Sequence, residues 1–459
     1  LGIIGVANFF GPNPYKSFWS NFERMEGLIT LLHLFAYFLV AGVVLSAEKL
    51  WMRFFQTSIA ISIIISYHSI LQFAGALSIT QSANRVEATL GNASYLATYI
   101  LVHAFLTLFL FVREHQSRWM QYFYGFVFFL QMLTLYATAT RGAFLGAIIG
   151  FLVFGLLVIF KGRDAPFLRK AALFAISGLS IFVLLLFVFK NSDFVRSSTP
   201  LKRFSSISLE QAKSRLILWE IAWKGFKERP FLGWGQEGFR FVFNTYYDPR
   251  MYGQEEWFDR THNIFLDWLV AGGILGLLGY CSLYAYALIT IWSRARPPPV
   301  VSQKKAREQN RSQATGEFAS LFSMPEKAVL TGLFAAYAVQ NFFVFDTLIS
   351  YVLFVSLIAY LHTRLIQVYP PQAATHSGGM SPLIGAFASP VIIGVACIGI
   401  YFINIQPILA ARNLDRAIKS RTEDAAKALE YFKKALEYRS FGAPEIRERL
   451  VIKTHELIR

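Results

Sequence analysis

The sequence predicts an all-α polytopic membrane protein. Of its 459 residues, 55% are hydrophobic and 16% aromatic, whereas only 16% are charged. Several apolar runs are long enough to cross the roughly 30 Å hydrocarbon layer, which requires about 20 helical residues. The runs are continuously apolar rather than alternating, and this excludes a transmembrane β-barrel.

The apolar runs give the order of the predicted helices. About ten crossings are expected in this chain, at residues 28–47, 54–78, 93–112, 119–140, 142–160, 170–189, 263–292, 326–345, 347–367 and 382–405. The chain begins at Leu1 rather than Met, so we expect a missing N-terminal piece, with residues 1–10 as the end of an earlier helix. The full protein would then have about eleven or twelve transmembrane helices.

Basic residues divide the loops into two classes. The net charge is +16, but most cations lie in short loops, which indicates membrane orientation rather than nucleic-acid binding. If residues 11–27 lie outside, the inside loops hold these cations: Lys49, Arg53, Arg113, Arg118, Lys161, Arg163, Arg169, Lys170, Arg294, Arg296, Lys304, Lys305, Arg307, Arg311 and Arg364. Residues 190–262 and the C-terminal tail then lie outside, and the basic linker 293–325 is cytoplasmic.

Residues 190–262 are the longest polar interval between apolar segments, and we expect a large extracytoplasmic loop with short helices. One of these helices should bury a stripe of apolar side chains: Leu216, Trp219, Ala222, Trp223 and Phe226. Pro230, Gly233 and Gly235 should end that helix in a tight turn, where glycines can admit a close approach by a ligand.

Two arginines on the outside face are candidates for anion binding. Arg141 lies between two apolar runs, where its planar guanidinium could bind a phosphate or extend to the membrane interface. Arg215 begins the loop helix, where the free amides of the first turn also favour an anion. Alternatively, it is a surface arginine paired with Glu220 or Glu210.

His262 is the candidate general base, because it lies at the outer end of the helix that closes the loop. An imidazole with an ordinary pKa of ~6.5 can accept a proton at working pH, although a surface histidine at a helix cap fits the same position. Asn263 could orient the ring or cap the helix. Outside loops hold neither an Asp-x-Asp pair nor metal-ligand spacing of histidines, so neither a metal nor another cofactor is expected. The cysteines, Cys281 and Cys397, lie in apolar runs and suggest packing.

The composition changes after residue 405. Apolar positions at helical spacing predict two helices in 406–459, with a third starting at Pro444, and Tyr431-Phe432 with nearby small residues resembles one tetratricopeptide repeat. A single repeat cannot bury its own face, so a longer array or a protein partner is expected. An amphipathic hairpin packed on the membrane domain (1–405) is the alternative.

Four stretches together resemble the O-antigen ligase family of integral-membrane enzymes. They are Gly91-Asn92-Ala93-Ser94-Tyr95-Leu96-Ala97, Thr140-Arg141-Gly142-Ala143, Arg215 with Pro230-Phe231-Leu232-Gly233-Trp234-Gly235, and His262-Asn263-Ile264-Phe265-Leu266 followed by Gly272-Gly273-Ile274-Leu275-Gly276. The resemblance implies a bacterial cytoplasmic-membrane enzyme whose active site faces the periplasm or exterior. It also implies metal-independent, inverting transfer of a glycan from an undecaprenyl-diphosphate-linked donor to a glycan, lipid or protein acceptor.

The resemblance also implies roles for individual residues. The family's diphosphate-binding arginines fall on Arg141 and Arg215, and its essential histidine falls on His262. We also predict that further residues in or beside the loop bind the substrate: Lys202, Arg203, Trp234 and Asn263. Polysaccharide polymerases and protein O-oligosaccharyltransferases of the same family are alternatives. An anion or lipid transporter, which the apolar helices would also suit, is the alternative from another class.

Overall fold

A computed structural model describes residues 1–22, 24–80, 85–113, 117–162, 166–205, 209–253, 257–295, 319–368, 382–420 and 424–458. Apart from two short antiparallel strands, β1 (Arg294–Ala295) and β2 (Ala319–Ser320), the regular structure of these residues is helical. They form two compact units. The larger comprises Leu1–Pro12 and Leu31–Pro370, and the smaller comprises Asn13–Thr30 and Pro371–Arg459.

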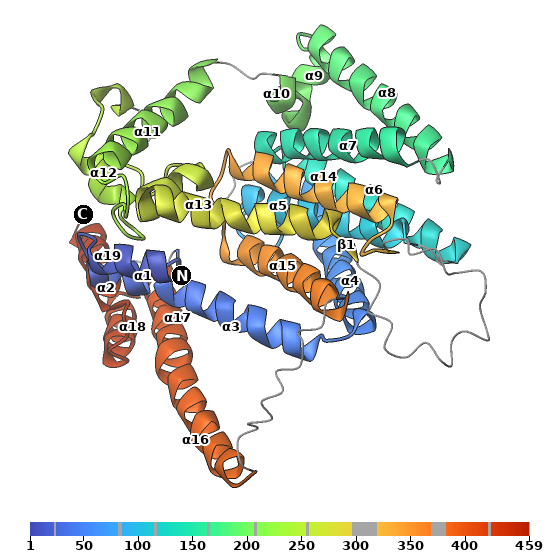
Figure 1. The fold of residues 1–459 in the computed structure, drawn as a ribbon. Helices are drawn as coiled ribbons and strands as arrows, with labels where there is room; N and C mark the ends of the chain where they lie inside the picture. The colour runs from blue at the N-terminus through green and yellow to red at the C-terminus, as the bar shows by residue number, and fades with distance from the viewer. Residues whose placement is uncertain are drawn as a thin grey trace. The chain divides into compact units, whose positions relative to one another are not determined.

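Each predicted apolar run forms a helix (Figure 1). These helices are α3 (Leu28–Val44), α4 (Glu48–Phe73), α5 (Ala93–Phe111), α6 (Arg118–Ala137), α7 (Arg141–Lys161), α8 (Pro166–Val188), α13 (Ile264–Trp292), α14 (Met324–Asn341), α15 (Leu348–Val368) and α16 (Pro382–Ile400), and α1 (Gly2–Phe9) precedes them. Within the described ranges, seven helices are long and apolar enough to cross a membrane: α4, α5, α7, α8, α13, α15 and the continuous stretch Pro390–Lys419. The prediction of an all-α polytopic membrane protein is therefore confirmed.

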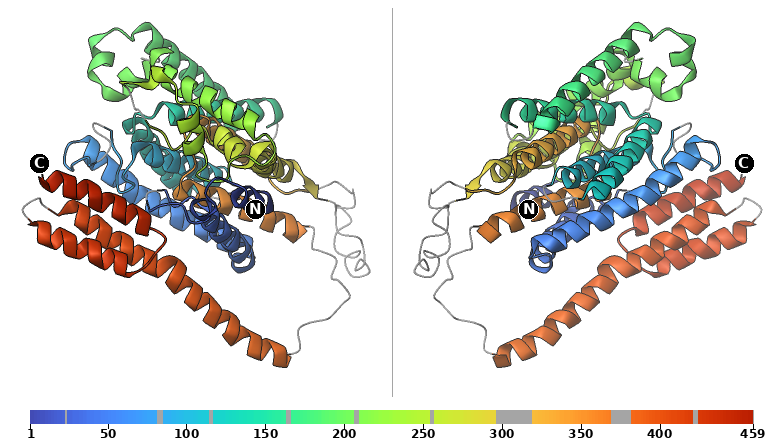
Figure 2. Two further views of the ribbon diagram at one scale, coloured as in Figure 1. Left: turned by 90° about the vertical axis from the view of Figure 1, so that its left-hand side faces the viewer. Right: turned by 90° about the vertical axis from the view of Figure 1, so that its right-hand side faces the viewer.

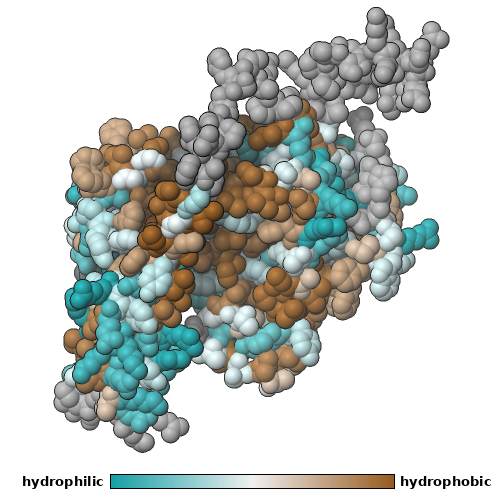
Figure 3. Space-filling model, turned by 90° about the horizontal axis from the view of Figure 1, so that it is seen from below, coloured by the Kyte–Doolittle hydropathy of each residue, from teal (hydrophilic) through white to brown (hydrophobic). Residues whose placement is uncertain are grey.

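The helices differ in how much of their apolar surface the protein itself covers. The apolar window of α5 is 78% buried, whereas that of α8 is 6% buried. Figure 3 shows broad apolar areas on one face of the molecule. Such large exposed apolar surfaces are expected where lipid replaces water as the solvent.

Glycines on α7 allow it to pack closely against α14. A Cβ added at Gly146 would lie 2.6 Å from the carbonyl oxygen of Ala336, and one at Gly150 would lie 2.7 Å from that of Gly332. Small residues four positions apart let membrane helices approach to backbone contact. This packing fixes the start of α7, and with it Arg141, relative to the end of α14.

Residues 190–262 contain the short helices that were predicted. They are α9 (Asp193–Ser197), α10 (Thr199–Ser205), α11 (Leu209–Glu228), α12 (Phe239–Thr245) and the 3-10 helix η1 (Pro249–Met251). The predicted stripe on α11 is partly wrong, because Leu216 and Trp223 are 46% and 48% exposed. The buried face is centred on Leu218 and Ile221, because α12 packs there: a Cβ added at Gly225 would lie 2.3 Å from a methyl group of Val242 on α12.

The turn that follows α11 docks on α13 through the backbone. Three hydrogen bonds join them: from Trp234 N to Val270 O (2.8 Å), from Gly235 N to Ala271 O (2.9 Å) and from Ile274 N to Pro230 O (2.8 Å). A regular helix could not offer these groups, but α13 is broken at Gly273, which has φ +61° and ψ −160°. The break exposes backbone donors and acceptors that the turn then satisfies.

Two glycines make this backbone contact possible. A Cβ at Gly233 (φ +67°) would lie 2.3 Å from the carbonyl oxygen of Val270, and one at Gly273 would lie 2.3 Å from that of Phe231. Both residues therefore need the left-handed backbone and the missing side chain. The close approach at this turn is made by the protein's own chain.

The smaller unit joins an N-terminal segment to the tail. It contains α2 (Pro14–Trp19), α16, the π-helical segment η2 (Tyr401–Ile405), α17 (Gln406–Lys419), α18 (Ala425–Glu437) and α19 (Ala443–Ile458), of which the last three lie side by side (Figure 2). Trp19 stacks on Phe441 at a centroid distance of 5.5 Å, and Phe22 N donates to Glu445 Oε2 at 2.8 Å. Residues 13–30 thus supply contacts for the tail, whose tetratricopeptide character stays a prediction.

We expect Gly273→Ala to destabilise the protein, because a side chain at that φ would overlap the carbonyl of Phe231. The strain should cost roughly 1–3 kcal/mol or more and lower the thermal unfolding midpoint of the protein purified in detergent. Gly279→Ala on the same helix is the matched control, because a Cβ there meets no atom within 4 Å. Equal midpoints for the two variants would contradict the docking contact.

Candidate active site

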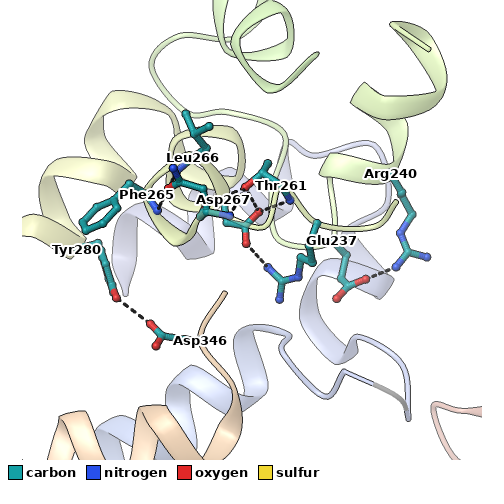
Figure 4. A network of polar contacts seen from close by, with 10 residues as sticks. Glu237, Arg240, Thr261, Phe265, Leu266, Asp267, Tyr280 and Asp346 are labelled. Atoms are coloured by element: carbon teal, nitrogen blue, oxygen red, sulfur yellow. Dashed lines mark hydrogen bonds and ion pairs between the residues drawn. The ribbon is translucent and has the colours of Figure 1, made fainter. Parts of the chain in front are cut away.

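The segment before α13 is held by one buried carboxylate (Figure 4). Thr261 N donates to Asp267 Oδ1 at 2.9 Å, and the Thr261 hydroxyl lies 2.8 Å from the same oxygen. Arg260 Nη1 lies 3.8 Å from Asp267 Oδ2. Asn263 caps the helix, since its Oδ1 accepts from the backbone N–H groups of the first turn. These contacts fix the chain on both sides of His262.

His262 has a left-handed backbone with φ +54°. A non-glycine residue in this region costs about 1–3 kcal/mol, so the neighbouring contacts must hold it there. Its half-buried ring lies between the rings of Phe258 and Phe345, each at a centroid distance of 5.5 Å. The imidazole is therefore held in a defined place by aromatic neighbours.

Helix α11 contacts the same segment. Trp219 Nε1 donates to the carbonyl oxygen of Thr261 at 3.2 Å, and the Trp219 ring packs against Phe342. Arg215 lies four residues before Trp219, and residues at this spacing share one face of a helix. The indole thus ties the face of α11 that carries Arg215 to the residue that precedes His262.

Four arginines come together near the start of α7, three of them on α7, α10 and α11. The prediction that Arg215 begins its helix is wrong, because α11 starts at Leu209 and Arg215 lies in its second turn, beyond the free amides of the first. Arg141 Nε donates to Arg203 O at 2.7 Å, and Arg203 Nε donates to Ala139 O at 3.0 Å. Arg85, in the segment before α5, donates from Nε to Thr138 O at 3.0 Å and from Nη2 to the Thr140 hydroxyl at 2.6 Å. We call Arg85, Arg141, Arg203 and Arg215 the arginine cluster.

The members of the arginine cluster repel one another. Burial, and then repulsion from the other three arginines, lowers the pKa of Arg85 to about 10. Arg215 is exposed as a whole, but partial desolvation of its guanidinium and repulsion from Arg203 lower its pKa. Arg203 and Arg215 also repel Arg141. No carboxylate in the described part of the chain pairs with Arg85, Arg203 or Arg215.

The repulsion makes the stability of the folded protein depend on pH. The folded chain binds the proton of Arg85 less tightly than the unfolded chain does, because the folded pKa of about 10 is well below the ordinary value of an arginine. The charged Arg85 therefore costs stability at neutral pH, and that cost falls only as the pH rises above about 10. A bound anion would remove the same cost at neutral pH.

Comparison with known proteins gives one family. Residues 126–281 match the family model described as O-antigen ligase. Over this stretch the chain is similar to O-antigen ligases. The matched stretch contains Arg141, Arg203, Arg215 and His262, whereas Arg85 lies before it. No curated protein matches the chain.

The other residues predicted to bind substrate lie elsewhere or have other partners. Lys202 is exposed on α10. The indole of Trp234 is buried in the loop core, donates to Gly225 O at 2.8 Å and lies under the guanidinium of Arg229. Asn263 is 2% exposed and caps α13. Within the described residues, no three His, Cys, Asp or Glu side chains are grouped so that they could hold a metal ion.

A buried polar network lies next to Phe345, one of the two rings that contact His262. The sequence did not predict it. Asp346 accepts hydrogen bonds from Tyr280 (2.7 Å), Asn341 (2.8 Å) and Ser350 (3.1 Å) and also from Tyr337; Figure 4 shows the Tyr280 contact. Asp346 follows Phe345, so the network fixes the turn that places this ring against His262. Its only signal in the sequence is a lone aspartate between two apolar runs.

We expect Arg215→Gln to leave the unfolding midpoint unchanged or higher in the absence of anions, because it relieves repulsion without removing a hydrogen bond. Inorganic pyrophosphate should stabilise the wild-type protein, and this gain should fall by roughly 1.5–3 kcal/mol in the variant, the range of a hydrogen bond to a charged group. The measurement is thermal unfolding in detergent with and without pyrophosphate. Lys227→Gln, which removes an exposed cation of the same helix, should respond like wild type. An equal gain in both variants would contradict an anion site at Arg215.

Proposed function

We propose that the protein transfers a glycan from an undecaprenyl-diphosphate-linked donor to an acceptor hydroxyl, with the diphosphate bound by the arginine cluster. The observation that carries this proposal is the convergence of four arginines, three of which have no acidic partner among the described residues. The family match supports a membrane glycosyltransferase-like function. The donor, the mechanism and the residue roles are the proposal.

The charge of the cluster suits the chemistry of the leaving group. The acceptor oxygen attacks the anomeric carbon, the bond from that carbon to the diphosphate oxygen breaks, and its electron pair leaves with the diphosphate. The leaving group thus gains one negative charge during the step, and guanidinium groups fixed around it stabilise that charge. Direct attack inverts the anomeric centre.

We assign His262 the role of the base that accepts the proton of the acceptor hydroxyl. Its ring is held between Phe258 and Phe345, and Trp219 connects the adjoining residue to the helix that carries Arg215. A base held in this way removes the proton as the oxygen attacks, a contribution of about 10²–10⁴-fold.

The place of these groups on their helices favours chemistry at the membrane surface over transport. Arg141 is the first residue of α7, and His262 lies two residues before α13. Transporters of known architecture bind their substrates near the bilayer midplane, between broken helices. A break does occur in α13, but the docked turn fills it.

We infer that this end of the bundle faces the periplasm or exterior of a bacterial cytoplasmic membrane. Basic residues concentrate at the opposite end, which the positive-inside rule places in the cytoplasm. Residues 13–30 and the tail, both predicted outside, belong to one compact unit, which supports a common side for the two segments. A polysaccharide polymerase or a protein O-oligosaccharyltransferase would use the same donor and differ in the acceptor.

We expect His262→Ala to reduce glycan transfer by about 10²–10⁴-fold while binding of the lipid-linked donor is retained. The assay supplies purified protein in detergent with a lipid-linked oligosaccharide and an acceptor, and it measures product and donor binding separately. His455→Ala in the exposed end of the tail is the matched control. Transfer by His262→Ala at the wild-type rate would refute the assigned base. Failure of the wild-type protein to transfer in detergent, together with anion movement in sealed vesicles, would favour the transporter.

A further inference from the structure

A second cationic site surrounds Trp292, the last residue of α13. The ammonium of Lys161, the last residue of α7, lies 4.4 Å from the centroid of the Trp292 ring. The ammonium of Lys327, in the first turn of α14, lies 5.4 Å from the same ring. Trp292 is fixed by its own hydrogen bond, since Nε1 donates to the Thr331 hydroxyl at 3.2 Å. The indole of α13 thus contacts two cations, one from α7 and one from α14.

This arrangement brings other positive charges close to the buried ammonium of Lys327. Lys327 is 9% exposed, and both Lys161 and Arg294 repel its ammonium. No carboxylate in the described ranges pairs with Lys161 or Lys327. The adjacent Glu326 is engaged elsewhere, by Ser323 N at 2.8 Å and Arg113 Nη1 at 3.4 Å. Cation–π contacts with one ring offset only part of the cost of desolvating an ammonium.

Two other arginines, Arg113 and Arg364, show how the charge of a partly buried cation is ordinarily neutralised. Arg113 pairs with Glu48 at 2.5 Å and with Glu326, and Arg364 also pairs with Glu48. Each of these arginines therefore has a carboxylate partner from the protein. Among the described residues, the site at Trp292 has no such carboxylate for its two lysines.

The apolar surroundings favour a lipid as the anionic ligand of this site. Phe160 and Ile289, next to Lys161 and near Trp292 in the sequence, are 72% and 70% exposed and present apolar side chains beside the cations. Lys161 and Arg141 lie at opposite ends of α7, about 30 Å apart by helical rise. The site is therefore separate from the arginine cluster and lies at the other membrane face, where tryptophan and basic side chains characteristically meet lipid headgroups.

We propose that Lys161 and Lys327, which contact the Trp292 ring, together with Arg294 two residues after Trp292, bind the phosphate of an anionic phospholipid headgroup. The three cations surround the phosphate, and the acyl chains lie along the exposed apolar faces of α7 and α13. Orientation of the chain in the membrane requires only that cations lie on this side. It does not require one of them to be buried against an indole beside two others.

The test uses the full chain in a neutral detergent and titrates short-chain phosphatidylglycerol while the thermal unfolding midpoint is measured. The double variant Lys161→Gln with Arg294→Gln removes two exposed cations of the site and should weaken half-saturation about thirtyfold. That change corresponds to about 2 kcal/mol at about 1.4 kcal/mol per tenfold, in line with the contribution of two basic residues to anionic lipid binding. Arg169→Gln with Lys170→Gln removes the same charge from exposed positions on α8 and should bind like wild type.

Two further arms identify the ligand. Phosphatidylcholine should give no saturable stabilisation, and inorganic phosphate should stabilise far less than phosphatidylglycerol at equal concentration. Equal weakening in the two double variants would overturn the site. Equal stabilisation by phosphatidylcholine would overturn the requirement for an anion, and saturation by inorganic phosphate alone would overturn the lipid as the ligand.

Discussion

The docking of one turn on one broken helix is the constraint on which the rest of the candidate site depends. Residues 230–235 end the segment that begins with α11, and residues 270–274 belong to α13 just after its first two turns. Because three backbone hydrogen bonds join these stretches, the two helices cannot slide relative to each other without breaking them. Arg215 belongs to the first helix and His262 precedes the second, so the turn sets their separation.

Backbone hydrogen bonds serve this purpose better than side-chain contacts would. In a membrane domain an unsatisfied carbonyl or amide is costly, so a broken helix must find partners for the groups it frees. The turn supplies these partners only if neither of the two stretches has a side chain at the contact, as is the case at Gly233 and Gly273. The glycines and the helix break thus depend on each other: the break leaves backbone groups unsatisfied without the turn, and the turn cannot approach without the glycines.

Charge balance distinguishes the proposed functional groups from the structural ones. Arg113 and Arg364 share carboxylates and need nothing further, and Asp346 receives several hydrogen bonds from neighbouring side chains. The arginine cluster has the opposite character, since its members lower one another's proton affinity. A group of like charges that the protein leaves uncompensated stores free energy that an anionic ligand can release on binding.

The sequence was sufficient to predict much of this arrangement. Continuous apolar runs predicted the helices, because lipid imposes a minimum length on each of them. Arg141, Arg203, Arg215 and His262 were all candidates, and the structure brings the three arginines into one cluster. The membership of Arg85 could not be predicted, because it depends on the contact of a loop with Thr138 and Thr140, which are distant in sequence.

Trp234 was predicted to bind substrate, and that role stays a prediction. The structure buries its indole in the loop core. The pattern of residues 230–235 identified a tight turn and a close approach, and both are present. The partner that approaches was the missing information, because a turn built to admit a ligand and one built to admit a second backbone require the same glycines.

The proposed orientation of the chain adds an argument about the arginine cluster. If the cluster lies on the outer side, its cations oppose the positive-inside bias that directs insertion, and four mutually repelling arginines also reduce the stability of the folded state. Neither cost is offset by contacts within the described chain for Arg85, Arg203 and Arg215. Water would solvate such charges equally well if they were spread over the loop, so their convergence favours an anion large enough to touch several of them at once. The diphosphate of the proposed donor lipid would have that size and charge, and the bilayer would deliver it to the depth at which α7 begins.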